Sequence, residues 1–289
     1  MNSIEIKVTE FFNGLTVEEL LKAWLIPKAE RHLIRMEKRL SLNGIIPNSQ
    51  SLVNSDNTII INFKEKSKFL PEGNPDLCQV LYEDENLIIV NKPDNMKTHG
   101  NFEGEIALQN HVASYCKKAV YVVHRLDFET SGTVLFAKNQ FVLPILSSLL
   151  EKRKIHREYE ALVTGHFPQN QFTINKNIGK DRHDSKKRIV SKTGQTAITQ
   201  VEVLKKFTQL SLVKCNLETG RTHQIRVHLS SLGHPILGDN LYGGQPNRRM
   251  MLHARRMIIT LPFSFKKIEV ISNSPSFDQA LYRSKIVME

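Results

Sequence analysis

The sequence is short of the residues that build disulfide frameworks, zinc sites and membrane anchors. Its three cysteines, Cys78, Cys116 and Cys215, lie far apart and form no CxxC pair, so neither cross-links nor structural zinc are expected. No apolar run approaches the ~20 residues that span a bilayer. Residues 1–7 contain no apolar stretch of signal-peptide length. We therefore expect a protein of a reducing compartment, the cytoplasm.

Acidic residues are also scarce relative to basic ones. Lys and Arg number 40 and Asp and Glu 29, which gives a net charge of +11. A positive surplus attracts phosphate backbones, so a nucleic-acid partner is favoured over the alternative of a merely basic protein. With 11 Pro, 14 Gly and 40% hydrophobic residues, nothing suggests a disordered or fibrous chain. The length of 289 residues predicts one or two domains.

The first 63 residues have the pattern of a small separate module. Residues 4–8 alternate as in a strand. Thr16 followed by Glu19 is a capping-box signature at the start of an amphipathic helix. A second, basic helix is predicted over residues 28–40, then a turn, and a strand over residues 58–63. Residues 15–63 resemble the S4-type RNA-binding module. The alternative is an ordinary αβ cap with a solvated basic face.

The rest of the chain predicts a linker and then a larger domain. Residues 64–75 are polar and hold Pro71, Gly73 and Pro75, which is typical of a linker. Residues 76–289 contain many strand-like segments and few helices, so we expect an α+β domain with a largely antiparallel sheet. Helices are predicted at residues 143–150 and 224–232, and strands at 80–82, 87–90, 121–123, 133–136, 159–163, 197–204 and 210–213.

The run HRLDFETSG at residues 124–132 carries the clearest chemical signal. It places Asp127 on a loop between two predicted strands. A carboxylate positioned beside a guanidinium can act as a nucleophile or a base. The alternative is that Asp127 caps the Thr130–Ser131 turn and pairs with Arg125. A kinase catalytic loop is excluded, because Leu126 separates the Arg from the Asp and no GxGxxG loop precedes.

This run resembles the signature of the RluA/RluD group of RNA pseudouridine synthases. A second signature of that group is matched by TGRTHQIRVHL at residues 219–229, continuing through LGHPILGD at 232–239 to residues 241–243. Weaker matches occur at residues 91–93, 157–159 and 252–254, in the family's order. The resemblance covers the chain from about residue 80 to its end. It implies the pseudouridine synthase fold, with a central, mostly antiparallel sheet and flanking helices.

The resemblance implies an isomerase that converts uridine to pseudouridine within RNA. The base is detached from the sugar at N1, turned and rejoined through C5, with no metal and no cofactor. By resemblance Asp127 is the catalytic aspartate, either attacking the sugar or acting as a base. Arg226 matches the arginine that pairs with it, and Tyr159 matches the active-site tyrosine. The alternatives are a surface ion pair for Arg226 and a core position for Tyr159.

Other residues are expected to contact RNA. Arg125 resembles the residue that fills the gap left by the flipped base, where a guanidinium can stack on neighbouring bases. Arg221 and His223 are expected to be structural or to face phosphate. The expected RNA contacts also include His124, Lys92 and His99. Residues 176–192 are strongly basic, which fits a solvated loop or an RNA-backbone contact equally well.

The sequence departs from the family at two points and leaves several alternatives open. Asn95 stands where the family has glycine, and we expect it to adopt the left-handed conformation that the turn needs. Gly100 follows His99 where proline is common. Large-subunit ribosomal RNA is the expected substrate and a monomer the default. The alternatives are a synthase acting on transfer RNA and a non-catalytic RNA-binding or ribosome-assembly factor. A metal-dependent hydrolase is disfavoured, since His223 and His228 form no HExxH pattern.

Overall fold

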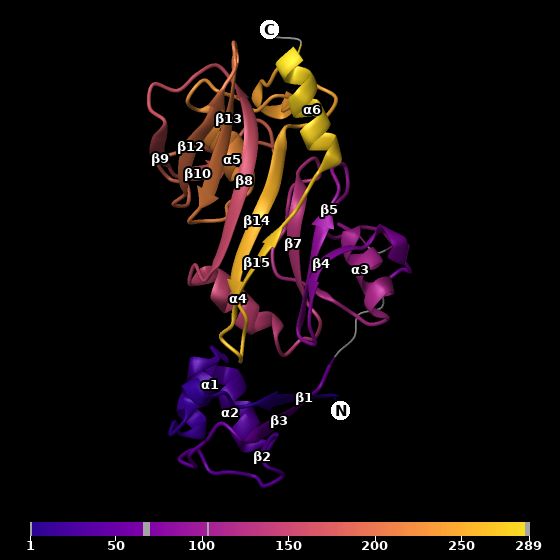
Figure 1. Ribbon diagram of the computed structural model, residues 1–289, viewed down its shortest axis with the longest axis vertical. Helices are drawn as coiled ribbons and strands as arrows, with labels where there is room; N and C mark the ends of the chain where they lie inside the picture. Colours follow the sequence, from indigo (N-terminus) through magenta and orange to yellow (C-terminus); the bar gives the residue numbers. More distant parts are fainter. Residues whose placement is uncertain (1, 66–69, 103, 287–289) are drawn as a thin grey trace.

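A computed structural model gives the structure of the chain, and it describes residues 2–65, 70–102 and 104–286. The molecule is elongated, with a small N-terminal part below a larger body built on one long sheet (Figure 1). In these described ranges no helix has the length and apolar character needed to cross a membrane.

The N-terminal part packs two helices on a three-stranded antiparallel sheet. The strands are β1 (Asn2–Lys7), β2 (Leu40–Leu42) and β3 (Thr58–Phe63), in the order β1-β3-β2. Helix α1 (Val17–Ala23) begins at the predicted capping box, where the Thr16 hydroxyl accepts from the Glu19 N–H. Helix α2 (Lys28–Met36) is shorter than predicted, because Lys38 has a φ of 51° and Leu40 already starts β2. A one-turn helix, η1 (Glu10–Phe12), precedes α1.

The larger body contains a ten-stranded sheet. Its main order is β4-β5-β7-β14-β8-β13-β12-β9, with β15 paired to β14 and β6 to β7. All pairs are antiparallel except β7 and β14, which run parallel. This agrees with the predicted α+β class and mostly antiparallel sheet. The strands are β4 (Gln79–Glu83), β5 (Leu87–Lys92), β6 (Tyr121–Val122), β7 (Ser131–Ala137), β8 (Ile155–Thr164), β9 (Gln171–Asn175), β12 (Ile198–Lys206), β13 (Leu210–Leu217), β14 (Leu252–Thr260) and β15 (Lys267–Ile271).

Helices and a short hairpin cover this sheet. The hairpin pairs β10 (Ile178–Lys180) with β11 (Arg188–Val190), inside the predicted basic segment. The helices are α3 (Leu108–Cys116), α4 (Leu143–Glu151), α5 (Gln224–Ser230) and α6 (Pro275–Ile286), with short turns η2 (Pro75–Leu77) and η3 (Asn240–Tyr242). The sequence predicted α4 and α5 but neither α3 nor α6. All seven residues of β7 are buried, as expected of a strand covered on both faces.

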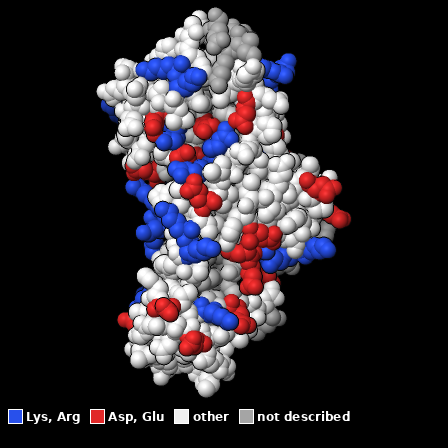
Figure 2. Space-filling view, viewed as in Figure 1, with Lys and Arg blue, Asp and Glu red and all other residues white. Residues whose placement is uncertain are grey.

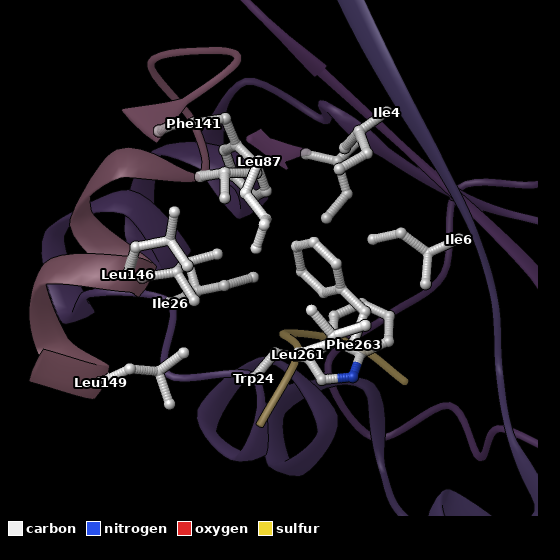
Figure 3. Close-up of a cluster of buried hydrophobic side chains, with 14 of the residues drawn as sticks. Ile4, Ile6, Trp24, Ile26, Leu87, Phe141, Leu146, Leu149, Leu261 and Phe263 are labelled. Carbon is white, nitrogen blue, oxygen red and sulfur yellow. The ribbon is translucent and has the colours of Figure 1, made fainter. Parts of the chain in front are cut away.

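The two parts share one hydrophobic core at their junction. The turn after β14 carries Phe263, whose ring meets Trp24 edge-on at 5.2 Å between centroids. Phe63 at the end of β3 stacks on Phe141. Figure 3 shows Trp24 of the N-terminal part and Phe141 and Phe263 of the body converging on this core. The burial of aromatic surface here fixes the N-terminal part against the body.

The predicted linker, residues 64–75, lies partly outside the described residues, at 66–69. Its last residues are bound to α3: the Gly73 N–H donates to the Ser114 hydroxyl at 2.8 Å, and the Asn74 N–H to His111 Nδ1 at 3.0 Å. The chain therefore enters the larger body already fixed to a helix.

Candidate active site

Asp127 lies on the loop between β6 and β7, and the main chain around it is held on both sides. The Leu126 carbonyl accepts from the Thr98 hydroxyl at 3.1 Å, and that hydroxyl accepts from the Leu126 N–H at 3.2 Å. The Thr130 N–H donates to the Asp127 carbonyl at 3.1 Å. The carboxylate itself remains 26% exposed. The loop is therefore fixed while its carboxylate stays accessible.

Arg226 on α5 reaches Asp127 across 99 residues of sequence. Its Nη1 donates to Asp127 Oδ2 at 3.3 Å. Its Nε and Nη2 donate to the two oxygens of Asp239, each at 2.8 Å, in a bidentate pair. Burial lowers the pKa of the Arg226 guanidinium, but Asp239, and then Asp127 and Glu129, outweigh it and raise that pKa. Arg226 is thus a fully charged group that Asp239 aims at Asp127.

Tyr159 on β8 completes a small pocket beside this pair. The pocket has a volume of about 70 Å³ and is lined by Asp127, Tyr159 and Arg226 among others. The Tyr159 ring is only 5% exposed. Burial raises the pKa of its phenol, and the charge of Asp127 adds to this. A flat, protonated phenol therefore lies close to the carboxylate.

The pocket adjoins an open cleft of about 950 Å³. Arg125, Asp127 and Arg221 line both the pocket and the cleft. Arg125 Nη1 lies 3.5 Å from His99 Nε2 at the cleft wall. Burial, and then the charge of Arg125, lower the pKa of His99. Figure 2 shows Lys and Arg side chains gathered at the waist of the molecule, at the level of α4, whose last turn borders this cleft.

Asp127 does not form the alternative pair with Arg125. Among the ion pairs of the described residues, its carboxylate contacts Arg226 and, at 3.9 Å, His223. Arg125 instead remains exposed. Arg221 is exposed too, and its Nε donates to the Thr196 carbonyl at 3.0 Å. The structure therefore brings Arg125, Arg221 and His99 to the cleft, where an RNA strand could reach them.

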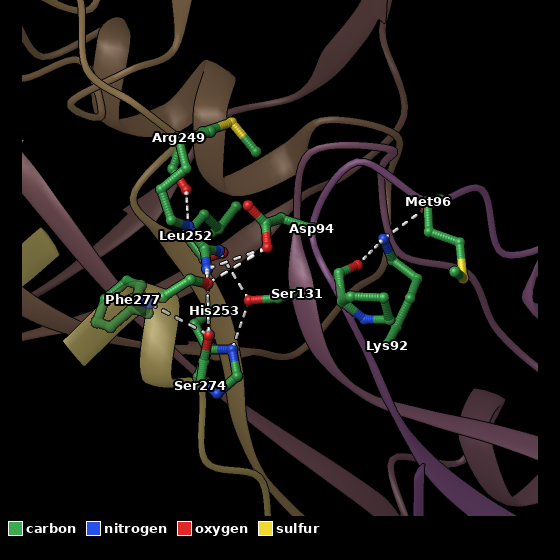
Figure 4. A network of polar contacts seen from close by, with 12 residues as sticks. Lys92, Asp94, Met96, Ser131, Arg249, Leu252, His253, Ser274 and Phe277 are labelled. Carbon is green, nitrogen blue, oxygen red and sulfur yellow. Dashed lines mark hydrogen bonds and ion pairs between the residues drawn. The ribbon is translucent and has the colours of Figure 1, made fainter. Parts of the chain in front are cut away.

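Two residues expected to contact RNA do not fit that expectation. Lys92 has no exposed surface, and its ammonium donates to the carbonyls of Pro93, Met96 and Phe128. Figure 4 shows the contact with Met96. Burial lowers the pKa of Lys92 to about 7, partly offset by Asp127. His124 is 7% exposed, its Nε2 accepts from the Leu135 N–H, and burial lowers its pKa to about 3. Both side chains are buried and hydrogen bond to the main chain, although His124 Nδ1 has no partner among the described residues.

His223 occupies an unusual position at the start of α5. Its backbone is left-handed, with a φ of 56°, a conformation that costs energy for a residue other than glycine. Its Nδ1 lies 2.8 Å from the Tyr242 hydroxyl, and its Nε2 lies 3.9 Å from Asp127 Oδ1. Burial lowers the pKa of His223, opposed by Asp127 and reinforced by Arg226. The ring therefore faces the free oxygen of Asp127.

The turn that carries Asn95 and the start of β7 both have the backbone they need. Asn95 has a φ of 56°, which confirms the expected left-handed conformation in place of glycine. Gly132 has a φ of 121°, and a Cβ there would lie 2.3 Å from the Ala254 carbonyl oxygen. Only glycine lets β7 approach β14 this closely.

Sequence reasoning gave no role to several residues that organise the site. Asp239 orients Arg226, and Glu129 approaches the same guanidinium at 3.4 Å. Arg249 is buried and donates to Ser131 at 2.8 Å, four residues after Asp127 (Figure 4). Asp239 and Glu129 lie inside the matched signatures, so their motif positions were the available signal. Their partners are distant in sequence, and pattern alone does not identify them. In the described ranges no group of three or more His, Cys, Asp or Glu is placed to hold a metal ion.

Comparison with known proteins agrees with this site. Residues 86–231 match the RNA pseudouridylate synthase family, and residues 4–59 match the RluD ribosomal pseudouridine synthase N-terminal domain. The chain is 36% identical to the RNA pseudouridine synthase YhcT of Bacillus subtilis, over 97% of each chain. It is 32% identical to ribosomal large subunit pseudouridine synthase D of Haemophilus ducreyi, over 91% of this chain and 88% of that one.

A solved structure has the same fold. Human RNA pseudouridylate synthase domain containing 1 superposes with a TM-score of 0.62 and 27% identity, covering 73% of this chain and 90% of that chain. The match at residues 86–231 includes Asp127, Tyr159 and Arg226, the three residues that meet at the pocket. On these grounds the chain belongs to the RNA pseudouridine synthase family, whose members are enzymes that isomerise uridine within RNA.

Proposed function

We propose that this enzyme converts a uridine of large-subunit ribosomal RNA to pseudouridine, with Asp127 as its catalytic residue. The observation that carries the assignment is the contact of Asp127 Oδ2 with the buried Arg226 at 3.3 Å, beside a pocket that Tyr159 closes. Several relatives that are at least 32% identical are named ribosomal large subunit pseudouridine synthase D. The substrate in their names supports ribosomal RNA for this chain.

Each of the three residues has a separate part in the proposed reaction. Breaking the bond between C1′ and N1 develops positive charge at the anomeric carbon, which the carboxylate of Asp127 stabilises. Arg226 orients that carboxylate through one oxygen and leaves the other free to face the sugar. Tyr159 supplies a flat surface for the detached base, and its hydroxyl is available for proton transfer.

The surrounding basic residues are proposed to hold the RNA. Arg125 is exposed next to Asp127 and would stack in the gap left by the flipped nucleotide. Arg221 and His99 border the same cleft and would contact the strand on either side. Support comes from the exposed side chains of Arg125 and Arg221 and from the net charge of +11. The hairpin β10–β11 carries further lysines and arginines that suit phosphate contacts.

The assignment of functions to the three parts of the chain is also a proposal. Residues 1–63 would form an S4-like RNA-binding module, residues 64–75 the connection, and residues 76–289 the catalytic domain. The basic helix α2 supports an RNA role for the module, since it presents Lys28 and Arg35 to solvent and Lys38 is exposed just after its end. We expect a monomer that acts without metal or cofactor in the cytoplasm, where ribosomes are assembled.

The test compares the wild-type protein with Asp127→Asn and Asp127→Ala on large-subunit ribosomal RNA transcribed in vitro. Wild type should form pseudouridine at one or a few positions, and both variants should form none while binding the RNA nearly as well. Glu269→Gln, which removes a carboxylate from an exposed ion pair, is the matched control. Full activity in either Asp127 variant would overturn the role of that residue.

Deletion of the gene in its host identifies the substrate. Pseudouridine mapping of total RNA should show the loss of one or more sites in large-subunit ribosomal RNA. Loss confined to transfer RNA would reassign the substrate but keep the chemistry. If no pseudouridine site in any RNA is lost and the purified protein still binds RNA, the proposed function fails. The alternative of a non-catalytic RNA-binding factor is then favoured.

A further inference from the structure

The contacts of His223 favour one of the two possible positions of its ring proton. Tyr242 lies between two groups: its hydroxyl oxygen accepts from the Arg188 N–H at 2.9 Å and lies 2.8 Å from His223 Nδ1. Since a backbone N–H can only donate, the phenol's own proton is free for His223. Burial raises the pKa of the Tyr242 phenol, so this proton is present at neutral pH. This arrangement favours His223 Nδ1 as the acceptor.

The other nitrogen of the ring faces the reactive carboxylate. A neutral imidazole that accepts at Nδ1 carries its proton on Nε2. Nε2 lies 3.9 Å from Asp127 Oδ1, whereas Arg226 holds the opposite oxygen, Oδ2. His223 also lines the small pocket with Asp127 and Tyr159. An N–H group is therefore aimed at the one oxygen of Asp127 that Arg226 leaves free.

The backbone shows that this placement is maintained at an energetic cost. His223 is left-handed, with a φ of 56°, immediately before α5. Such strain in a residue other than glycine persists where the surroundings impose it, and it is concentrated at functional sites. Here the Tyr242 hydroxyl and the edge-on contact of the two rings, with centroids 5.6 Å apart, impose it.

From these contacts we propose that His223 is a further residue of the active site, acting as a neutral N–H donor on the Oδ1 side of Asp127. Tyr242 and the main chain of Arg188 are the positioning groups that fix its tautomer. The inference rests on the proposed function of Asp127. In the structure Nε2 and Oδ1 are 3.9 Å apart, beyond hydrogen-bond distance. As uridine enters, the two atoms approach and the Nε2–H donates to Oδ1, which keeps that oxygen directed at the sugar. A charged imidazolium would instead lock Oδ1 in an ion pair and withdraw it from the reaction.

The charges around His223 favour its neutral form. Burial, Arg226 on α5 and Arg188 on β11 lower its pKa, while Asp127 on the loop and Asp239 before η3 raise it. Because the lowering causes prevail, His223 is neutral at pH 7 and takes up its proton only on acidification. The fall in activity at low pH, the acid limb of the pH–rate profile, should therefore report on the protonation of His223.

The first test reads the tautomer without any turnover. In ¹⁵N NMR spectra of the full-length protein at pH 7, with the signal assigned through His223→Asn, Nδ1 should show the shift of an unprotonated nitrogen. Tyr242→Phe keeps the ring over Arg226 but removes the hydroxyl, so the shifts of the two nitrogens should move toward an average. A protonated Nδ1 in the wild type, or unchanged shifts in Tyr242→Phe, would overturn the inference.

The second test uses pseudouridine formation on the same ribosomal RNA transcript. His223→Asn should lower kcat by up to about a hundredfold, the loss expected when a reacting group is misplaced by about 1 Å. His223→Gln, whose amide reaches the place of Nε2, should recover part of that loss and remove the acid limb. Tyr242→Phe should move the acid limb to higher pH, because the donor that keeps Nδ1 unprotonated is gone. A purely structural role would lower activity without moving the limb.

Controls separate this inference from the proposed function. His156→Gln changes an exposed histidine of β8 outside the pocket and should match the wild type. If the wild type forms no pseudouridine, the proposed function fails, and the NMR result still decides the tautomer. If the wild type is active, Asp127→Ala is inactive and His223→Asn keeps full kcat, only the role of His223 is refuted.

Discussion

The pair of Arg226 and Asp239 gives the sharpest quantitative expectation. Asp239→Asn keeps the shape of the side chain but removes its charge and replaces one acceptor oxygen with an NH2 group, which can only donate. The side chain of Arg226 is 3% exposed and that of Asp239 is 0% exposed, so water cannot replace the lost partner. Removing one member of such a buried pair costs about 3–5 kcal/mol. Asp127 and Glu129 still approach Arg226, so we expect the lower end, about 3 kcal/mol.

Activity should fall together with stability, because Arg226 loses one of the two contacts that aim it and the charge that holds it. Nη1 would then no longer hold Asp127 Oδ2 at 3.3 Å. Losing about 1.4 kcal/mol of transition-state stabilisation is a tenfold loss of kcat/KM, and we expect at least that. Urea unfolding gives the free energy, and single-turnover pseudouridine formation gives the rate.

The matched control is Glu269→Gln, which removes the same charge from a pair with Arg256. Those side chains are 47% and 35% exposed, so the change should cost less than about 1 kcal/mol. The reasoning is refuted if Asp239→Asn unfolds at the same urea concentration as Glu269→Gln. It is also refuted if Asp239→Asn is destabilised and yet forms pseudouridine at the wild-type rate.

Three further perturbations test the remaining features. Lys92→Met removes the ammonium that donates to three carbonyls around the Asp127 loop. It should lower kcat at least tenfold, about 1.4 kcal/mol, with RNA affinity nearly unchanged, and a wild-type kcat would show that Lys92 does not position the loop. Phe263→Ala should cost about 3–5 kcal/mol in urea unfolding, because the ring is buried against Trp24; a cost below about 1 kcal/mol would show that the junction contributes little. Burial lowers the pKa of His124 to about 3 and of His253 to about 4, so below about pH 6.5 the unfolded chain takes up protons that the folded chain does not. The contribution of these two histidines to stability should be complete above that pH and should fall, for each histidine, by roughly 1.4 kcal/mol per pH unit down to about pH 4. Equal unfolding free energies at pH 7 and pH 5 would contradict this.

Local chemistry was predictable where one short stretch determines the structure. The capping box at Thr16 and Glu19 formed as its spacing predicts, because both partners lie within one helical turn. The buried strand β7 followed from its uninterrupted apolar and small residues. Asn95 took the left-handed conformation that a turn of this kind needs. In each case the interactions that decide the structure are close in sequence.

Strand β14 was not predicted, although it lies near the middle of the sheet. Its sequence contains two adjacent arginines, which hide the alternation typical of a strand. In the fold each arginine finds an acid on the neighbouring strand β8: Arg255 pairs with Glu160 and Arg256 with Glu158. The two arginines are stable in a sheet because each pairs with an acid more than 90 residues earlier in the sequence. No local sequence pattern contains that information.

The same reason explains why Lys92 and His124 were assigned to RNA. A lysine or histidine beside a catalytic motif has the right charge for phosphate, and its burial cannot be inferred from the sequence. In the fold the three carbonyls that surround the Lys92 ammonium come from two separate loops. The pairing of Asp127 with Arg226 was expected through family resemblance, and its spacing of 99 residues offers no independent clue.

These contacts explain how a carboxylate can be both positioned and free to react. The main chain on each side of Asp127 is held by Thr98 and Lys92, which hydrogen bond to Leu126 and Phe128. The side chain, in contrast, accepts a single hydrogen bond from the described part of the chain, at Oδ2. A group fixed through its backbone needs little reorganisation when the substrate arrives, and its free oxygen retains its reactivity. The basic groups that support Asp127 are therefore buried, and Arg125 and Arg221, which would meet RNA, are exposed. Because both sets carry the same charge, charge alone could not tell them apart in the sequence.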